Sequence, residues 1–163
     1  MPEDPESTFR PSRLGDDTPM ITLAAQGDIS AQSLMVEHVL ACGNDGDVPV
    51  GIALGAAEAF ARLAAESGLV AERRRLCGVL LIMSDNLWNG GFVERSRIYQ
   101  GEALAIMSTL ADEGDEYSAT LLSQFAEHFS PQILKLADQI IRGGERPKPD
   151  EGCSGDNDPT KIH

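Results

Sequence analysis

The chain has 163 residues, which is enough for one domain with a substantial buried core. Acidic side chains outnumber basic ones by 26 to 13, so the formal net charge is −13. This excess argues against a nucleic-acid-binding protein and against a protein that docks on anionic membranes, because both partners call for a basic surface. Alanine and leucine are the most numerous apolar residues, and both favour helices.

Neither a targeting segment nor a membrane span is expected. No stretch approaches the roughly 18 apolar residues of a membrane-spanning helix. The first residues are acidic and rich in proline, whereas a secretory signal starts basic and continues apolar. We therefore expect a cytoplasmic protein. Cys42, Cys77 and Cys153 are odd in number and lack CxxC spacing, which argues against a disulfide framework or a zinc site. The thiols of Cys42 and Cys77 are expected to be buried.

Composition divides the chain into three parts. Residues 1–19 are acidic and rich in proline, and residues 143–163 are polar and rich in glycine and proline. Both segments lack apolar residues to bury, so they are predicted to be a disordered arm and a disordered tail. Residues 20–142 form the predicted folded domain, and its pattern predicts an all-α fold.

Apolar periodicity and helix-stop residues predict a series of helices in this domain. The expected helices cover residues 29–41, 52–66, 70–84, 94–112, 116–129 and 131–142. Residues 85–92 are rich in asparagine and glycine, so a loop is expected there. Ser130 and Pro131 indicate the start of the last helix, and Gly143 indicates its end. One apolar stripe on this helix predicts a cap that docks by a single face. The stripe consists of Ile133, Leu134, Ala137, Ile140 and Ile141.

A short pattern recurs at three helix junctions and indicates an internal repeat. Each copy has a small apolar helix end, an acidic or amide residue, a glycine, a turn, an alanine and then a leucine. The glycines are Gly27, Gly68 and Gly114, the alanines Ala31, Ala71 and Ala119, and the leucines Leu34, Leu76 and Leu122. The glycine is expected to end one helix in a left-handed turn, the alanines to let two backbones approach, and the leucine to fill the gap. The glycines lie 41 and 46 residues apart, and repeats of this length are typical of solenoids.

These residues resemble the Sel-one-like repeat, a relative of the tetratricopeptide repeat. That family carries AAxxGxxxAxxxLG at its helix turn and a loop of the form GxGV(P) between repeats. Here residues 42–50 read CGNDGDVPV and residues 89–94 read NGGFVE. The resemblance covers about residues 20–129, although the distance from glycine to alanine changes from four to three to five residues. It implies a short right-handed α-solenoid of two to three antiparallel helix pairs, followed by the C-terminal capping helix. An unrelated helical bundle is the alternative fold.

No catalytic constellation is recognisable, so we expect no enzyme, no metal site and no cofactor. The three histidines have none of the paired spacings of metal-binding helices, and His38 lies on an apolar stripe where a core histidine is expected. Four acidic residues surround Gly114, and we interpret them as an exposed helix junction whose charges favour the start of the next helix. They are Asp112, Glu113, Asp115 and Glu116.

The resemblance implies that the concave side of the helix stack binds a protein or peptide. The expected function is therefore a non-catalytic protein–protein interaction module or adaptor, with helices 52–66 and 94–112 lining the surface. The candidate partner-binding residues are Glu58, Arg62, Arg73, Arg74, Trp88, Phe92, Arg97, Glu102 and Ser108. The alternative interpretation of Arg73 and Arg74 is that they lie on a solvated helix face. The alternative interpretation of Trp88 and Phe92 is that they close the core beneath the loop.

The acidity of the chain supports a second hypothesis, a small acidic regulator or inhibitor that occupies a basic cleft or mimics nucleic acid. Residues 1–19 contribute −3 and residues 143–163 contribute −2 to the net charge of −13, which leaves −8 for the folded part. Self-association into a homo-oligomer is a further expectation, because two to three repeats bury little surface on their own.

Overall fold

The computed structural model describes residues 18–143, which form seven α-helices and one 3₁₀ turn without any β-strand. The helices are α1 (Thr18–Ala25), α2 (Ile29–Asn44), α3 (Val50–Ala65), α4 (Val70–Asn89), α5 (Val93–Asp112), α6 (Glu116–Phe125) and α7 (Pro131–Ile141), and the 3₁₀ turn η2 (Ala126–His128) follows α6. The predicted all-α class is confirmed. The predicted arm and tail lie outside the described residues, apart from Thr18, Pro19 and Gly143, and so does Cys153.

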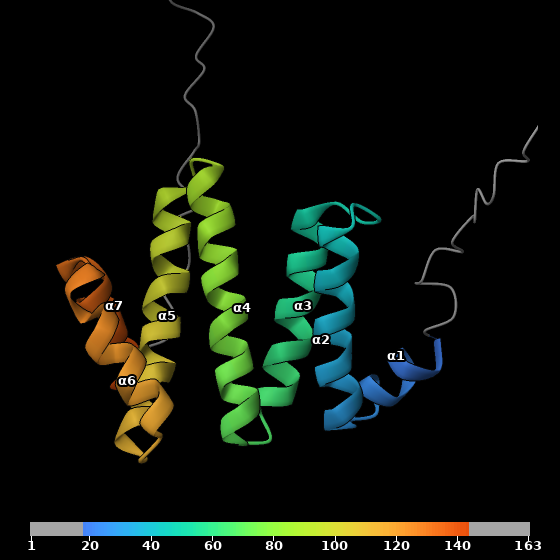
Figure 1. Ribbon diagram of the computed structural model, residues 1–163, viewed down its shortest axis with the longest axis horizontal. Helices are drawn as coiled ribbons and strands as arrows, with labels where there is room; N and C mark the ends of the chain where they lie inside the picture. The colour runs from blue at the N-terminus through green and yellow to red at the C-terminus, as the bar shows by residue number, and fades with distance from the viewer. Residues whose placement is uncertain (1–17, 144–163) are drawn as a thin grey trace, which may run out of the picture.

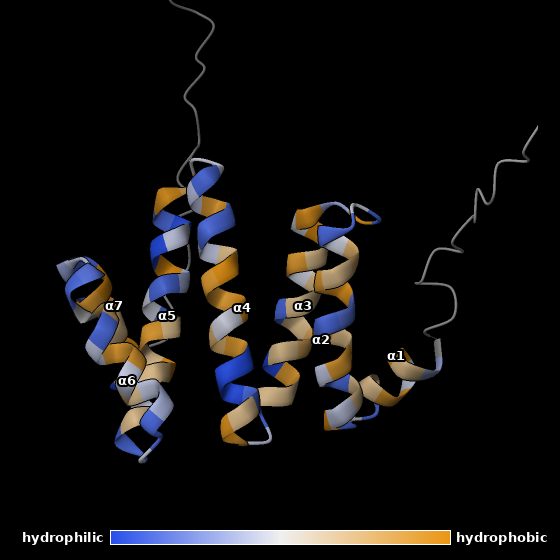
Figure 2. Cartoon of the chain, viewed as in Figure 1, coloured by the Kyte–Doolittle hydropathy of each residue, from blue (hydrophilic) through white to orange (hydrophobic). Residues whose placement is uncertain are grey.

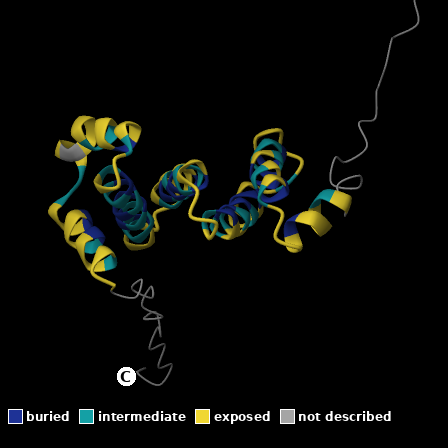
Figure 3. Ribbon diagram, turned by 90° about the horizontal axis from the view of Figure 1, so that it is seen from below, coloured by how far each residue is buried: buried dark blue, intermediate teal, exposed yellow. Residues whose placement is uncertain are grey.

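Helices α2 to α5 run antiparallel and stand side by side in a row, and the short helix α1 lies obliquely to α2 (Figure 1). Each helix from α1 to α6 packs on the next, and α7 returns to pack on α5. The turns after α1, α3 and α5 lie along one edge of the row, and the turns after α2 and α4 lie along the opposite edge (Figure 1). Helices α2 to α5 carry most of the buried residues, whereas the terminal helices α1, α6 and α7 are mostly exposed (Figure 3).

The three glycines of the predicted repeat end helices in the left-handed conformation, as expected. Their φ angles are 92° at Gly27, 75° at Gly68 and 96° at Gly114. A side chain at such φ values is strained, so glycine is favoured at each position. The backbone N–H of each glycine donates to the carbonyl oxygen three residues earlier, which closes the helix end.

Helix α4 is longer than the sequence predicted, because it includes residues 85–89 of the expected loop. It ends at Asn89, two residues before Gly91, whose φ of 83° leaves the helical conformation. The backbone N–H of Phe92 then donates to the carbonyl of Leu87 at 2.9 Å and closes the end. The buried hydroxyls of Ser84 and Ser96 share a hydrogen bond of 2.9 Å, so this last part of α4 is tied to α5. Helix α6, in contrast, is shorter than predicted, because it ends at Phe125 and not at residue 129.

The register of the repeat differs from the prediction at its alanines. The buried residue is always the fourth after the turn glycine, and these residues are Ala31, Glu72 and Ser118. Ala71 and Ala119 are exposed, so their assignment to helix contacts was wrong. Consecutive helical residues are separated by about 100° around the axis, so a shift of one residue moves a side chain off the packed face.

The predicted burial of Leu34, the leucine of the first copy, is wrong for the same reason. Leu34 is 51 % exposed, and Met35, the eighth residue after Gly27, is buried in its place. Leu76, the eighth residue after Gly68, is buried as expected, and Leu122 is partly buried against the core. The fourth and eighth residues after each of the three turn glycines are thus buried or partly buried.

Small residues let the helices approach closely at two further places. A Cβ atom added at Gly43 of α2 would lie 2.7 Å from Ala53 Cβ of α3. A Cβ atom added at Gly101 of α5 would lie 2.7 Å from both Cγ and Cδ2 of Leu136 in α7. Along α3, the side chains of Ala57, Ala61 and Ala64 are completely buried. The alanine content of the chain thus sets the helix spacing.

Replacement of Gly101 by alanine is expected to lower the free energy of unfolding by about 2 kcal/mol, because Leu136 and α7 must shift. Gly78 of α4 is the matched control, since it is also a mid-helix glycine but has open space around it. Gly78→Ala should raise the free energy of unfolding by about 0.5–1 kcal/mol through helix propensity. Urea denaturation measures both changes, and a stabilising Gly101→Ala would contradict the tight α5–α7 contact.

Candidate partner-binding surface

Three of the candidate binding residues, Glu58, Arg62 and Glu102, meet in one polar cluster between α3 and α5. The guanidinium of Arg62 donates to both carboxylate oxygens of Glu102, at 2.5 and 2.9 Å, and to Oε1 of Glu58 at 2.8 and 2.9 Å. The hydroxyl of Tyr99 donates to Oε2 of Glu58 at 3.0 Å. Hydrogen bonding to Glu102 raises the pKa of Arg62 above its ordinary value. Sequence reasoning missed Tyr99.

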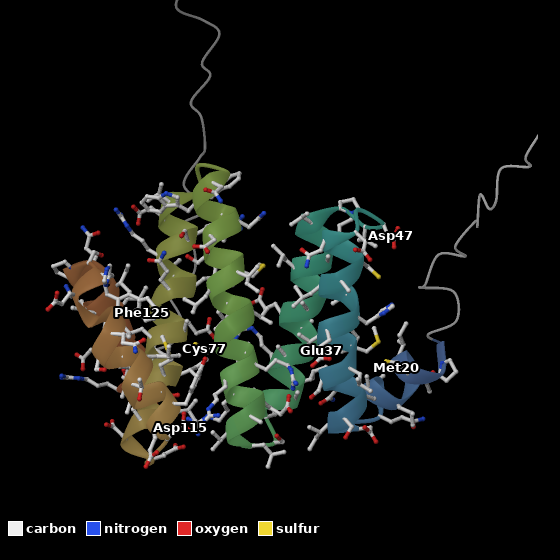
Figure 4. The ribbon with its side chains drawn as sticks, in the orientation of Figure 1. Met20, Glu37, Asp47, Cys77, Asp115 and Phe125 are labelled. Atoms are coloured by element: carbon white, nitrogen blue, oxygen red, sulfur yellow. The ribbon has the colours of Figure 1, made fainter. Side chains whose placement is uncertain are left out.

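The arginines at the start of α4 also have partners within the chain. Arg73 donates to Glu113 at 2.5 Å, and the guanidinium of Arg74 forms an ion pair with Asp115. Arg74 Nε lies 3.0 Å from Asp115 Oδ2, and the Arg74 guanidinium lies 5.0 Å from the centre of the Tyr117 ring. Figure 4 labels Asp115 at the turn that leads into α6. Two acidic residues of the predicted junction, Glu113 and Asp115, thus form ion pairs with these arginines.

Asp115 additionally caps α6. Its Oδ2 accepts the backbone N–H of Ser118 at 3.0 Å and the Ser118 hydroxyl at 2.6 Å. Hydrogen bonds from Arg74, and then from Ser118, hold the pKa of this carboxyl well below its ordinary value of 3.8. The charged form of Asp115 is therefore strongly favoured in the folded chain.

The lowered pKa of Asp115 predicts acid sensitivity. A carboxyl with a lowered pKa in the folded state stabilises the fold at neutral pH and loses that contribution as the pH falls below its ordinary value. Asp115→Asn should therefore destabilise the chain at pH 7, and the difference from the unmodified chain should shrink steadily below about pH 5. Ser118→Ala should have an intermediate effect. Urea denaturation across this pH range measures the differences, and parallel pH curves would contradict the role of Asp115.

A third cluster joins α2 to α4 around the buried Glu72. The hydroxyl of Ser33 donates to Glu72 at 2.6 Å, and Arg75 donates to both carboxylate oxygens of Glu72 at 2.7 and 2.9 Å. Arg75 also contacts Glu37 at 3.2 Å, which Figure 4 labels on α2. Hydrogen bonds from Ser33 and Arg75 lower the pKa of Glu72 despite the opposing effect of its burial.

The three clusters share one geometric rule. Each joins two alternate helices of the row, α2 to α4, α3 to α5, or the start of α4 to the turn before α6. The residues bonded between these elements lie 38 to 41 positions apart in the sequence, close to the 41 residues between Gly27 and Gly68 and fewer than the 46 residues between Gly68 and Gly114. Six of the eight basic residues between positions 18 and 143 form ion pairs with acidic residues of that same part of the chain. Four of these six residues, namely Arg62, Arg73, Arg74 and Arg75, join different structural elements.

The remaining candidates are not brought together with these clusters. Trp88 in the last turn of α4 and Phe92 before α5 are 53 % and 57 % exposed, so they do not close the core beneath the turn. Arg97 forms an ion pair with Glu94 one turn earlier in α5. Trp88 and Phe92 are the two candidates with large apolar surfaces open to solvent.

Ser108 lies in a shallow groove where α5, α6, the segment after α6 and α7 meet. The groove has a volume of about 250 Å³. Its lining is mostly apolar and consists of Leu104, Ser108, Leu122, Phe129, Leu134, Ala137, Asp138 and Ile141. The capping helix α7 buries Ile133 and Ala137 and exposes Leu134 and Ile141, so it docks by a narrower face than its apolar stripe suggested.

The described residues hold no group of three or more histidine, cysteine or acidic side chains arranged for a metal ion. Cys42 and Cys77 are buried free thiols, as predicted, and burial raises the pKa of Cys77 to about 11. His38 lies one helical turn before Cys42, with its Nε2 3.7 Å from the sulfur. None of the helices between residues 18 and 143 combines the length and apolar character needed to cross a bilayer.

Comparison of this chain with models of known protein families, with curated proteins and with solved structures finds no match.

Proposed function

We propose that the chain is a non-catalytic protein–protein interaction module, built as a short right-handed α-solenoid related to the Sel-one-like repeats. The observation that carries this proposal is the recurrence of polar contacts between alternate helices at separations of 38 to 41 residues. Equivalent positions of stacked repeats are expected to contact one another at about one repeat length.

The exposed apolar side chains support the proposal that the row of helices binds a protein. Fifteen large apolar residues of the described part of the chain are exposed, and they include Trp88, Phe92 and Ile52. Single exposed apolar residues are ordinary, but aromatic residues are enriched where proteins meet. Because two loops and several helix faces carry these residues, the surface suits a protein or peptide more than a small molecule.

The charge distribution gives less support to an acidic mimic of nucleic acid. Such a mimic would need its acidic residues along one stripe. Exposed acidic residues instead lie along both edges of the row, where the turns are, and also within helices. Asp45, Asp47 and Asp85 lie along one edge, Asp28, Glu66, Asp112 and Glu116 along the other, and Glu37 and Asp138 within α2 and α7.

Affinity capture from the native cell tests the proposed function. The purified full chain is immobilised, and the recovered proteins are quantified against an empty matrix. Recovery of one protein in stoichiometric amount, which then forms a defined complex with the purified chain by calorimetry, is the expected result. Recovery of nothing above the empty matrix would contradict an adaptor function.

A further inference from the structure

Helix α3 exposes an apolar face that has no partner among the described residues. Its exposed positions are Ile52, Gly55, Ala59 and Leu63, which recur at intervals of three and four residues. Ile52 is 65 % exposed and Leu63 is 43 % exposed. We call these four residues the α3 face. The opposite side of α3 is also apolar and packs in the core through alanines, so α3 is hydrophobic along most of its length (Figure 2).

An exposed apolar face is unusual for a surface helix in so acidic a chain. The outer side of a surface helix normally carries charged residues. Here the two charged residues of α3, Glu58 and Arg62, both point into the cluster with Glu102 and Tyr99. The α3 face spans about 16 Å at 1.5 Å per residue, which matches about three turns of a second helix. Nothing lies within 4 Å of a Cβ atom placed on Gly55, so a partner backbone can approach closely there.

The charges around the α3 face specify the chemistry of its partner. Exposed Asp47 lies in the turn before α3, and exposed Glu66 follows its last residue. Arg62, the one basic residue of α3 and its two flanking turns, is held by two carboxylates. The apolar face is therefore bordered by negative charge at both ends. A second copy of this acidic chain would bring like charges together, whereas a basic partner would be attracted.

We propose that the α3 face binds an amphipathic helix of a partner protein, with an apolar side of about three turns and lysine or arginine at both ends. This inference rests on the proposed function and names the partner class. Helices that lay an apolar face against a complementary surface are a common mode of peptide recognition. Ile52 and Leu63 supply the apolar anchors, and Gly55 and Ala59 permit the close approach between them.

A peptide selection on the full chain tests the proposal. A phage-displayed library of helical peptides of about 18 residues, randomised on one face and at both ends, is enriched on the immobilised chain. Recovered peptides are synthesised with a fluorescent label and titrated by anisotropy. We expect an apolar stripe at helical spacing with basic ends. We expect Ala59→Arg to raise Kd at least about tenfold, the effect of losing a central contact. The matched control Ala119→Arg, at an exposed alanine of α6, should leave Kd unchanged.

The outcomes separate the site from the function. Peptides that bind Ala59→Arg as tightly as the unmodified chain would overturn the α3 face and leave the adaptor function standing. Peptides with acidic ends would overturn the charge argument. A dimer of the unmodified chain in sedimentation, abolished by Ala59→Arg, would assign the face to a second copy instead. A library that yields no binder, together with empty affinity capture, would contradict the proposed function as well.

Discussion

Replacement of Leu80 by alanine is expected to lower the free energy of unfolding by about 3 kcal/mol. Leu80 is completely buried in α4, and it belongs to the core cluster that includes residues of α2, α3 and α5. The substitution removes three buried carbon atoms and leaves a cavity that the surrounding helices can fill only in part. Because each helix of the row contacts few others, a loss at α4 weakens the link between the two halves of the row.

Leu34→Ala provides the matched control for Leu80→Ala. Both substitutions shorten leucine to alanine within a helix, but Leu34 is 51 % exposed. We expect Leu34→Ala to change the free energy of unfolding by less than about 0.5 kcal/mol, as is usual for a surface position. Urea denaturation followed by circular dichroism measures both. A loss at Leu34 as large as that at Leu80 would restore the register first predicted from the sequence.

The helices and their turns could be predicted because their signals are local. The glycines that end α1, α3 and α5 need a left-handed conformation, and the alanine- and leucine-rich stretches between them favour helix. Ser130 and Pro131 mark the start of α7 by the same local chemistry, since the Ser130 hydroxyl accepts the backbone N–H of Ile133. Tertiary packing only moves such boundaries, as it does where α4 runs on to Asn89.

The packed face of each helix could not be predicted from residue type alone. The repeat was aligned on its alanines, yet the buried residue four positions after Gly68 is a glutamate. A buried carboxylate is unexpected at a helix contact unless it is paired. Glu72 is paired with Arg75 and Ser33, but Ser33 lies 39 residues away. Only the folded chain shows that pairing, so the alanine next to Glu72 was favoured.

The intramolecular partners of the candidate arginines could not be predicted for a related reason. Unless it is known which helices meet, the acidic residues around Gly114 and the arginines after Gly68 look like two unrelated clusters in the sequence. Once the order and length of the helices are known, a residue about 40 positions away becomes the first partner to examine. That rule relates Arg73 to Glu113 and Arg62 to Glu102, both separated by 40 residues. The sequence therefore holds both residues of each pair but not the helix arrangement that brings them together.

Replacement of Arg62 by methionine is expected to lower the free energy of unfolding by about 2 kcal/mol. The substitution keeps the apolar stem but leaves the carboxylates of Glu58 and Glu102 side by side without their cation. Both carboxylates are largely buried, with side-chain exposures of 15 % and 14 %, so water replaces the guanidinium poorly. Arg62 itself is about one-third exposed, which keeps the loss below that of a fully buried pair. Urea denaturation measures the change.

Two further variants decide whether charge or packing causes the loss. Glu58→Gln with Glu102→Gln, added to Arg62→Met, should recover part of the stability, because the repulsion between the carboxylates is removed while the helix contact is kept. Arg142→Met breaks an ion pair with Asp138 at an exposed position and should cost less than about 0.5 kcal/mol. If Arg62→Met cost no more than Arg142→Met, the α3–α5 cluster would be an ordinary surface pair, and the polar contacts between alternate helices would contribute little to holding the stack together.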